Sequence, residues 1–276
     1  MNDLELIVDK IKRDKGFDLS GYKESTLSRR IERRFQFDGA SSTGEYIRMI
    51  DKDYHLYWRF ISDFFIGVTD FFRDKEIWEI VMEKVLPEII ARRTSHVSRP
   101  TSHVAQLPLR IWSAGCSTGE ETYSLAIMIR EIYEKQSIKG LPAFVHGTDI
   151  LEDKLEFAKR GFYTKEKTKG IENALLEKYF DQRDTNNEIR NTIKIMMRFK
   201  KLDLVCPEGY AGFDMIACRN VLIYFQRGLQ EKVIKHFHKA LRPNGILWLG
   251  KSETLWGETE TLFEPVYKNE KIFRKM

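Results

Sequence analysis

The sequence predicts an α/β fold with a mainly parallel sheet, preceded by an all-helical N-terminal region. From residue 109 to 250, apolar runs of strand length alternate with stretches of helical periodicity, which is the pattern of successive βα units. Residues 1–91 show helical periodicity throughout. The chain has 276 residues. We expect a helical domain at 1–75, a linker helix and flexible loop at 76–108, and the α/β domain at 109–276.

The composition indicates a soluble globular protein, because 42% of the residues are hydrophobic and 32% are charged. No apolar run is long enough to span a bilayer, and the N-terminal segment is amphipathic and charged, unlike a signal peptide. We therefore expect a cytoplasmic protein without membrane insertion. Three cysteines that are far apart form no metal-type pair and indicate a reducing compartment. They are Cys116, Cys206 and Cys218.

The second predicted helix, Tyr22 to Phe37, is unusually basic. Leu27, Ile31 and Phe35 form its apolar stripe. The other faces carry Arg29, Arg30, Arg33 and Arg34. Arginines can hold carboxylates or phosphates with forked hydrogen bonds, so this helix is a candidate binding face. The alternative is a solvated face with intrahelical ion pairs.

Further helices are expected along the rest of the N-terminal region. Phe71-Phe72 lies between two of them and requires burial. The loop from Thr94 to Pro108 has no periodicity, and we expect its histidines, His96 and His103, to be exposed rather than metal ligands. The expected helices are 4–11, one through Tyr46 and Ile50, 53–65 and 76–92.

The most informative stretch runs from Leu109 to Ile129. Leu109–Trp112 predicts a buried strand, Ser113–Gly119 a turn of small residues, and the sequence from Glu120 a helix. Such a turn lets a ligand lie against the backbone and offers it the free N–H groups of a helix N-terminus.

The two glutamates that open this helix restrict the ligand. Glu120 and Glu121 would repel a pyrophosphate. No lysine follows Gly119, as a phosphate-binding loop would require, and the glycines lack the spacing of a dinucleotide-binding site. S-adenosylmethionine fits, because it carries an ammonium, a sulfonium and an adenosine but no phosphate. The alternative is an ordinary βα turn with solvated glutamates.

The next strands bring polar residues to the same edge of the sheet. Ala143–His146 predicts a strand, and Asp149 follows it where an acidic residue commonly holds ribose hydroxyls. Phe213–Cys218 predicts another strand, with Arg219-Asn220 at its carboxyl end. The other expected elements are helices at 151–160, 171–180 and 226–241, a polar turn at 181–187, a strand or hairpin arm at 188–200, a strand at 246–249 and a hairpin at 263–273.

Three motifs are spread along the chain: Val68-Thr-Asp-Phe-Phe-Arg73, Trp112-Ser-Ala-Gly-Cys-Ser-Thr-Gly-Glu-Glu121 and Cys218-Arg-Asn-Val-Leu-Ile-Tyr-Phe225. With Gly147-Thr-Asp-Ile150 and Leu241–Leu247, they resemble the chemotaxis receptor methyltransferases, the CheR family. Enzymes of this family transfer a methyl group from S-adenosylmethionine to glutamate side chains of membrane chemoreceptors. The first and third motifs, in this order, carry the most specific part of the resemblance.

The resemblance implies a class I S-adenosylmethionine-dependent methyltransferase. Its fold is Rossmann-like, with a seven-stranded mainly parallel sheet, an all-α N-terminal domain and a small β-subdomain, here at about residues 180–201. It implies protein-glutamate O-methyltransferase activity, S-adenosylhomocysteine as product and no metal. The implied partner is the cytoplasmic domain of chemoreceptors, which the arginines at 29, 30, 33 and 34 would face.

The resemblance also implies roles for individual residues. Thr69 and Arg73 would contact the methionine end of the cofactor, and Gly115 and Glu120 would line its pocket. The remaining positions are Asp149 for the ribose, Asp203, Leu204, Arg219 and Asn220 near the adenine and sulfonium, and Tyr224 near the transferred methyl.

The sequence departs from the family pattern at three places. Gly67 stands where many relatives have Asn, and Asp203 where relatives often have Asn. In some relatives the β-subdomain binds a C-terminal receptor peptide as an added strand, and the glycine-rich loop that those relatives carry is replaced here by Asp184–Asn187. We therefore expect an enzyme that needs no C-terminal pentapeptide tether. Arg92 and Arg93 are candidates for an arginine of the linker helix.

The implied reaction is a displacement at a sulfonium methyl by a carboxylate that is already ionised at neutral pH. It needs no general base, so alignment and removal of water should supply the catalysis. We expect Arg219 to guide the substrate carboxylate and Tyr224 to shape the approach of the methyl; core packing is the alternative for Tyr224.

Other functions stay open on the sequence. An RNA or small-molecule methyltransferase would use the same fold, although the aromatic and basic residues do not alternate as in common RNA-binding modules, so we expect no nucleic acid partner. A non-catalytic cofactor-binding adaptor is a second alternative. A dehydrogenase is disfavoured by the glycine spacing.

Overall fold

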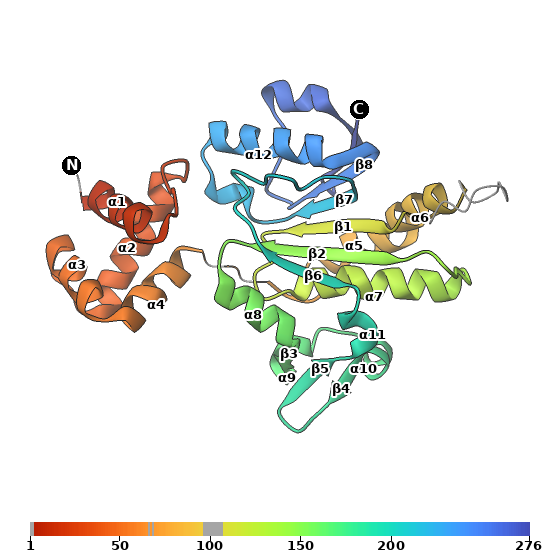
Figure 1. Cartoon of the computed structure of the whole chain (residues 1–276), viewed down its shortest axis with the longest axis horizontal. Helices are drawn as coiled ribbons and strands as arrows, with labels where there is room; N and C mark the ends of the chain where they lie inside the picture. Colours follow the sequence, from red (N-terminus) through yellow and green to blue (C-terminus); the bar gives the residue numbers. More distant parts are fainter. Residues whose placement is uncertain (1–2, 66, 68, 96–106) are drawn as a thin grey trace. The chain divides into compact units, whose positions relative to one another are not determined.

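The computed structural model describes residues 3–65, 67, 69–95 and 107–276. They form two compact units, each described here by itself (Figure 1). The helical unit consists of the chain up to residue 66 together with 221–232. The α/β unit consists of 67–220 and 233–276. The predicted loop with His96 and His103 lies largely outside the described residues.

The N-terminal helices of the helical unit confirm the predicted pattern. Apolar residues at helical spacing bury one face of each helix, and Ile7, Tyr46 and Phe60 are completely buried. Two helices begin at side-chain caps: the Ser42 hydroxyl accepts from the Glu45 N–H, and the Asp53 carboxylate accepts from the N–H groups of His55 and Leu56. The four helices are α1 (Asp3–Lys15), α2 (Glu24–Asp38), α3 (Thr43–Lys52) and α4 (Tyr54–Phe64).

A second piece of chain completes the helical unit. It contains the 3₁₀ turn η2 (Leu222–Tyr224) and the start of α12 (Arg227–Ala240). The N–H of Lys23 donates to the carbonyl of Tyr224 (3.0 Å), and the N–H of Gln226 donates to the carbonyl of Gly21 (2.8 Å). The helical unit is thus built from two segments far apart in the sequence, which the sequence analysis did not predict.

The α/β unit is built on a seven-stranded sheet in the order β6-β2-β1-β7-β8-β10-β9. The strands from β6 to β8 are parallel, and β10 runs antiparallel to both β8 and β9. The predicted α/β fold with a mainly parallel sheet is therefore confirmed. The bounds are β1 (Leu109–Ala114), β2 (Ala143–Asp149), β6 (Met197–Lys201), β7 (Phe213–Cys218), β8 (Leu241–Leu249), β9 (Phe263–Tyr267) and β10 (Ile272–Lys275), with the 3₁₀ helix η3 (Gly257–Leu262) before β9.

Helices cover both faces of this sheet. Trp112 of β1 and Arg198 of β6 point to the same face, because both are in register with His146 of β2. Phe237 of α12 packs on Trp112 (ring centroids 5.3 Å apart), whereas α7 (Glu120–Lys135) packs its Tyr123 on Phe199, on the opposite face. The remaining helices are α5 (Lys75–Ile80), continued through the π-helical turn η1 (Val81–Val85) into α6 (Leu86–Ser95), and α8 (Glu152–Arg160).

A small antiparallel sheet follows α8, but its bounds differ from the predicted 180–201. Its strand order is β3-β5-β4, with β3 (Phe162–Thr164), β4 (Phe180–Gln182) and β5 (Asn186–Ile189). A polar turn was predicted at 181–187, but in the structure it consists of only the three residues between β4 and β5. The predicted strand at 188–200 is broken by α11 (Asn191–Lys194), after which β6 pairs with β2 in the main sheet. Two more short helices belong to this region, α9 (Lys165–Thr168) and α10 (Asn173–Tyr179).

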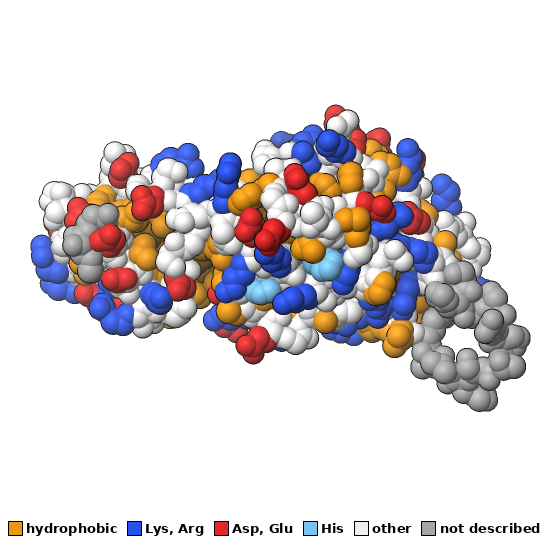
Figure 2. Space-filling model, turned by 90° about the horizontal axis from the view of Figure 1, so that it is seen from above, with side chains coloured by type: hydrophobic (Ala, Val, Ile, Leu, Met, Phe, Trp, Pro, Cys, Tyr) orange, Lys and Arg blue, Asp and Glu red, His pale blue; other side chains and the backbone are white. Residues whose placement is uncertain are grey.

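Charged side chains of both signs are interspersed over the face drawn in Figure 2. This agrees with a formal net charge of only +5 over the whole chain. No helix among the described residues is both long and apolar enough to cross a membrane.

Candidate cofactor site

Most of the predicted cofactor residues of the α/β unit lie at one edge of the main sheet. Gly115 follows β1, Asp149 ends β2, Asp203 and Leu204 follow β6, and Arg219 and Asn220 follow β7. These strands are parallel neighbours, so their carboxyl ends share an edge, where open α/β sheets bind ligands.

The turn between β1 and α7 is shaped by residues in the left-handed region of the backbone map. Gly115, Gly119 and Ser117 have φ of 73°, 93° and 49°. The N–H groups of Gly115 and Cys116 both donate to the carbonyl of Thr148 at 2.8 Å, which ties the turn to the end of β2. A Cβ atom on Gly119 would lie 2.8 Å from the Cβ of Ala158, so the turn admits no side chain there.

Asp149 is held by this turn. Its carboxylate accepts hydrogen bonds from the N–H of Ser117 (2.8 Å) and the N–H of Leu151 (3.0 Å). Burial raises the pKa of Asp149, and these N–H donors act in the opposite direction. Each oxygen keeps a lone pair for a further donor, which is what a ribose diol requires.

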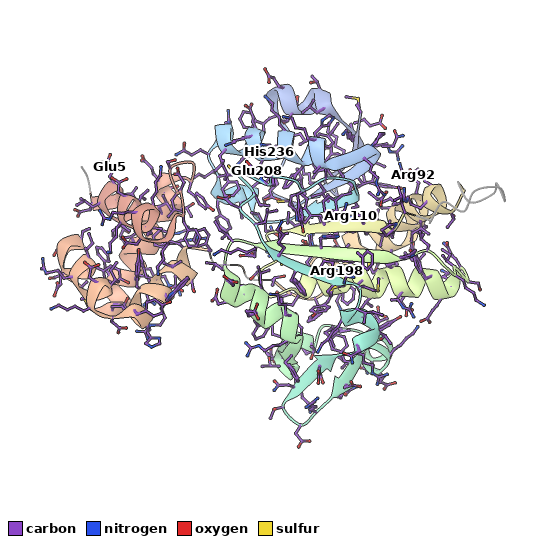
Figure 3. The ribbon with its side chains drawn as sticks, in the orientation of Figure 1. Glu5, Arg92, Arg110, Arg198, Glu208 and His236 are labelled. Atoms are coloured by element: carbon purple, nitrogen blue, oxygen red, sulfur yellow. The ribbon has the colours of Figure 1, made fainter. Side chains whose placement is uncertain are left out.

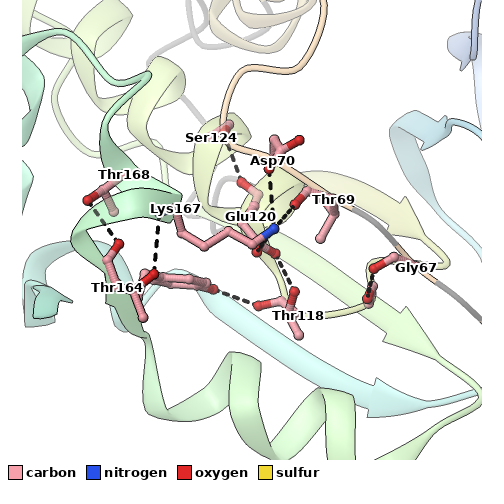
Figure 4. Close-up of polar contacts among 11 residues, drawn as sticks. Gly67, Thr69, Asp70, Thr118, Glu120, Ser124, Thr164, Lys167 and Thr168 are labelled. Atoms are coloured by element: carbon pink, nitrogen blue, oxygen red, sulfur yellow. Dashed lines mark hydrogen bonds and ion pairs between the residues drawn. The ribbon is translucent and has the colours of Figure 1, made fainter. Parts of the chain in front are cut away.

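Glu120 places a second carboxylate beside the same turn (Figure 4). Only 1% of the residue is exposed, and its carboxylate accepts from the Thr118 hydroxyl at 2.7 Å. Burial raises the pKa of Glu120, while Thr118 and the ammonium of Lys167, 3.8 Å from the carboxylate, lower it. A buried carboxylate of this kind is suited to an ammonium ligand.

The segment that precedes α5 forms one wall of the site. The carbonyl of Gly67 accepts from the Ser117 hydroxyl at 3.0 Å, and the N–H of Phe72 donates to the Ser124 hydroxyl at 3.1 Å. The carbonyl of Thr69 accepts from the Lys167 ammonium at 2.8 Å. Phe71 and Phe72 are buried, as predicted. The described residues of this segment, 67 and 69–74, are therefore fixed to both the turn and α7, and we call them the wall loop.

Arg219 is buried behind the wall loop, with only 2% of its side chain exposed. It donates to Asp74 (2.6 Å) and to the carbonyl of Arg73 (3.0 Å), and it lies 3.5 Å from the carboxylate of Glu121. Its guanidinium also stacks on Trp248 at 4.4 Å. Two carboxylates already neutralise the charge of Arg219. This arrangement favours a role in holding the wall loop, rather than the predicted role of guiding the substrate carboxylate directly.

Asn220 and Asp203 are positioned by local hydrogen bonds. The N–H of Asn220 (φ 60°) donates to the carboxylate of Glu253, which also accepts from the N–H of Gly250. Asp203 accepts from the N–H of Val205 at 2.8 Å. Leu204 is buried.

Backbone strain is concentrated around this edge of the sheet. Four non-glycine residues with positive φ belong to its loops: Phe72, Asp74, Ser117 and Asn220. Each costs conformational energy that the surrounding contacts must offset, and such residues cluster at ligand sites. The described residues contain no group of histidine, cysteine and carboxylate side chains that would hold a metal ion.

The donors and acceptors at this edge match S-adenosylmethionine. Asp149 can accept ribose hydroxyls and Glu120 can hold an ammonium, while Gly119 lets the turn pack closely against the side chain of Ala158. A seven-stranded sheet of this order with these side chains at its carboxyl edge is typical of an S-adenosylmethionine-dependent methyltransferase. The chain belongs to the CheR methyltransferase family: it matches the CheR methyltransferase SAM binding domain over residues 67–272 and the CheR methyltransferase all-alpha domain over residues 2–65.

Several bacterial proteins are similar to this chain. The chain is 32% identical over 259 residues to chemotaxis protein methyltransferase 1 of Pseudomonas aeruginosa, covering 92% of this chain and 90% of that protein. It is 31% identical over 245 residues to the chemotaxis protein methyltransferase of Listeria innocua, covering 89% and 87%. It is also 30% identical over 234 residues to an uncharacterized 104.1 kDa protein of Rhodobacter capsulatus, of which it covers 23%.

The other predicted residues belong to the helical unit. Tyr224 lies in η2, where the guanidinium of Arg30 stacks on its ring at 4.6 Å. Arg30 and Arg34 are buried, and Arg34 pairs with Asp38 (2.7 Å) and Asp63 (3.1 Å). Arg29 and Arg33 are exposed. The candidate receptor-binding face of α2 is therefore reduced to Arg29 and Arg33.

Several site residues were missed by the sequence analysis. Ser117, Asp74 and Glu253 orient the predicted residues, and Lys167 reaches the site from α9. Ser117 lies inside a recognised motif and could have been selected from it. Lys167 lies in no motif, and only the tertiary structure brings it to Glu120.

Proposed function

We propose that this protein transfers the methyl group of S-adenosylmethionine to glutamate side chains of chemoreceptor cytoplasmic domains and produces glutamate methyl esters. The observation that carries the proposal is a candidate cofactor site with buried Glu120 and half-buried Asp149 in a chain that matches both CheR domains. The relatives named chemotaxis protein methyltransferase support a role in the same signalling process.

The proposed roles are those that the family resemblance implies for these positions. Thr69 and Arg73, in the wall loop, would bind the carboxylate of the cofactor, and Glu120 its ammonium. Asp149 would accept the ribose hydroxyls, and Asp203, Leu204 and Asn220 would enclose the adenine. When bound, S-adenosylmethionine supplies an electrophilic methyl group on a positively charged sulfur.

The reaction needs no base from the protein. A substrate glutamate is ionised at neutral pH, so one of its oxygens can form the new bond to carbon as the carbon–sulfur bond breaks. This step cancels the negative charge of the carboxylate and the positive charge of the sulfonium. A site that excludes water therefore favours it, and the protein's task is to align the two groups.

We propose a positioning role for Arg219 and a catalytic role for Tyr224. Arg219 would keep the wall loop against Glu121 and so preserve the pocket for the methionine end. Tyr224 would shape the approach of the substrate to the methyl. The exposed Arg29 and Arg33 would contact the acidic methylation segment of a receptor.

We also propose that no C-terminal receptor tether is required. The outer strands of the small sheet, β3 and β4, have only three residues each. They offer few backbone groups to an added peptide strand, and affinity in that binding mode comes from main-chain hydrogen bonds.

The test is methylation of a purified receptor cytoplasmic fragment with labelled S-adenosylmethionine. We expect base-labile label in the fragment, lost when its methylation-site glutamates are changed to alanine, and equal labelling of fragments with and without the C-terminal pentapeptide. The Asp149→Ala protein is the control. Labelling of RNA or of small molecules in place of the fragment would contradict the proposed substrate.

A further inference from the structure

Lys167 brings a protein ammonium to the candidate cofactor site. Its Nζ atom donates to the carbonyl of Thr69 (2.8 Å) and to Asp70 (3.2 Å), and lies 3.8 Å from the carboxylate of Glu120 (Figure 4). The side chain is 40% exposed, so it reaches the buried carboxylate from the solvent side.

The acceptors around this ammonium are those that an amino-acid ammonium would need. A primary ammonium has three N–H donors and is held by carboxylate and carbonyl oxygens. Lys167 already takes the Thr69 carbonyl and pairs with Glu120, the carboxylate proposed for the ammonium of the cofactor. Two ammonium groups sharing one buried carboxylate repel each other.

We propose that Lys167 competes with the ammonium of the cofactor for the carboxylate of Glu120. The lysine side chain pairs with Glu120 in the free protein and is displaced when the cofactor binds. This inference rests on the role proposed for Glu120, and it adds a residue that sets cofactor affinity without contacting the transferred methyl.

The position of Lys167 also ties this competition to the small sheet. Lys167 lies in α9, directly after β3. The neighbouring Thr168 is buried and accepts a 2.6 Å hydrogen bond from the Asn187 amide of β5. The end of α9 is thus anchored, so we expect the ammonium to be displaced by rotation of the lysine side chain.

The experiment is calorimetric titration of the full chain and its Lys167→Met variant with S-adenosylhomocysteine and with 5′-methylthioadenosine. The second ligand has the adenosine and thioether but neither ammonium nor carboxylate. We expect Lys167→Met to bind S-adenosylhomocysteine roughly threefold or more tightly, the scale of one partly exposed ion pair, and 5′-methylthioadenosine unchanged. Lys167→Arg should stay close to the original protein.

The matched control is Lys169→Met, because Lys169 pairs with Glu166 at the surface, two positions along the same segment. Weaker or unchanged binding of S-adenosylhomocysteine by Lys167→Met would overturn the inference, and so would an equal gain for both ligands, which would indicate opening of the wall loop. These outcomes do not depend on the methyl acceptor, so they are distinct from a failure of receptor labelling.

Discussion

At the scale of single residues, the close approach of Gly67 to Ser117 explains a departure from the family pattern. A Cβ atom at Gly67 would lie 2.5 Å from the Oγ of Ser117, closer than any side chain tolerates. The carbonyl of Gly67 accepts from that same hydroxyl. In this chain the position that is Asn in many relatives has no room for a side chain unless Ser117 changes as well.

We predict that Gly67→Ala weakens binding of S-adenosylhomocysteine, by about tenfold, because the clash moves the wall loop away from the turn. Calorimetry measures the change. Ser117→Gly should restore affinity in the double variant, since it removes the obstructing hydroxyl and suits the positive φ of this position. Additive losses in the double variant would show that the two residues do not interact.

A second prediction concerns the pH dependence of cofactor binding. Burial raises the pKa of Glu120 above its usual value, so its charge is lost at a higher pH than for an exposed glutamate. Affinity for S-adenosylhomocysteine should be highest near neutral pH and should fall as the pH drops towards that raised pKa. Dissociation constants measured between about pH 8 and pH 5 would show it.

The variant Glu120→Gln separates this effect from that of Asp149, whose pKa burial also raises. We expect the variant to bind S-adenosylhomocysteine more weakly at neutral pH and with a smaller pH dependence. An undiminished pH dependence in Glu120→Gln would assign the whole effect to Asp149.

Sequence reasoning found the residues of the site that belong to motifs but not their partners. Glu120 and Asp149 were predicted because small-residue turns and strand ends are local features. Lys167 donates to a carbonyl 98 residues away, and Arg219 to a carboxylate 145 residues away. Such pairs arise only when the sheet brings distant loops together, and no spacing in the sequence encodes them.

At the scale of elements, β2 carries a histidine between two cations. Burial, then Arg110 and Arg198, lower the pKa of His146 to about 4. Figure 3 labels both arginines, which come from the neighbouring strands β1 and β6. The ring nitrogen Nδ1 lies 3.1 Å from the hydroxyl of Tyr210. Folding therefore favours the neutral imidazole.

This gives a third prediction, with the sign fixed by the depressed pKa. The stability contributed by neutral His146 is present above about pH 6.5, the ordinary histidine pKa, and is lost as the pH falls towards 4. The loss should be on the order of 2 kcal/mol, since the ring is partly exposed. In His146→Phe, unfolding by denaturant should depend less on pH over this range, whereas a change at exposed His55 should leave the dependence intact.

The sequence predicted long apolar strands well and short polar ones poorly. β1 and β7 are mostly apolar and largely buried on both faces, so composition identifies them. β5 is Asn-Asn-Glu-Ile, and β6 contains Arg198 and two lysines. Both lie where one face is open to solvent, so their side chains resemble those of turns, and only hydrogen-bonded pairing makes them strands.

At the scale of the whole chain, the division into units differs from the predicted one. The helical unit ends at residue 66 rather than 75, because the wall loop is fastened to the turn after β1 and belongs to the α/β unit. Residues 221–232, which lie between β7 and the second half of α12 in the sequence, belong to the helical unit and not to the α/β unit. The apolar sequence Val-Leu-Ile-Tyr-Phe suits either unit, so the pattern could not assign it.

Tyr224 gives the fourth prediction. Its ring covers the buried guanidinium of Arg30, so Tyr224→Ala should destabilise the helical unit by about 1–3 kcal/mol and lower its melting temperature. Tyr224→Phe should retain most of the stability, because the ring remains and only the hydrogen bond between its hydroxyl and Arg30 is lost. Thermal unfolding followed by circular dichroism measures both variants.

The matched control is Tyr54→Ala, in the same unit but 63% exposed. If Tyr224→Ala unfolds at the same temperature as this control, the ring does not stabilise Arg30. Turnover of Tyr224→Phe on a receptor fragment would then separately report the contribution of the hydroxyl to the proposed reaction.

Because residues 221–232 belong to the helical unit, a chimera of two relatives must be designed with two junctions in mind. A chimera joined at residue 66 would combine the N-terminal helices of one protein with the β7–α12 connection of another. Gly21, where a Cβ would lie 2.5 Å from the side chain of Leu229, shows how closely the two segments are matched. The helical unit should therefore be exchanged in two pieces, with both segments taken from the same relative.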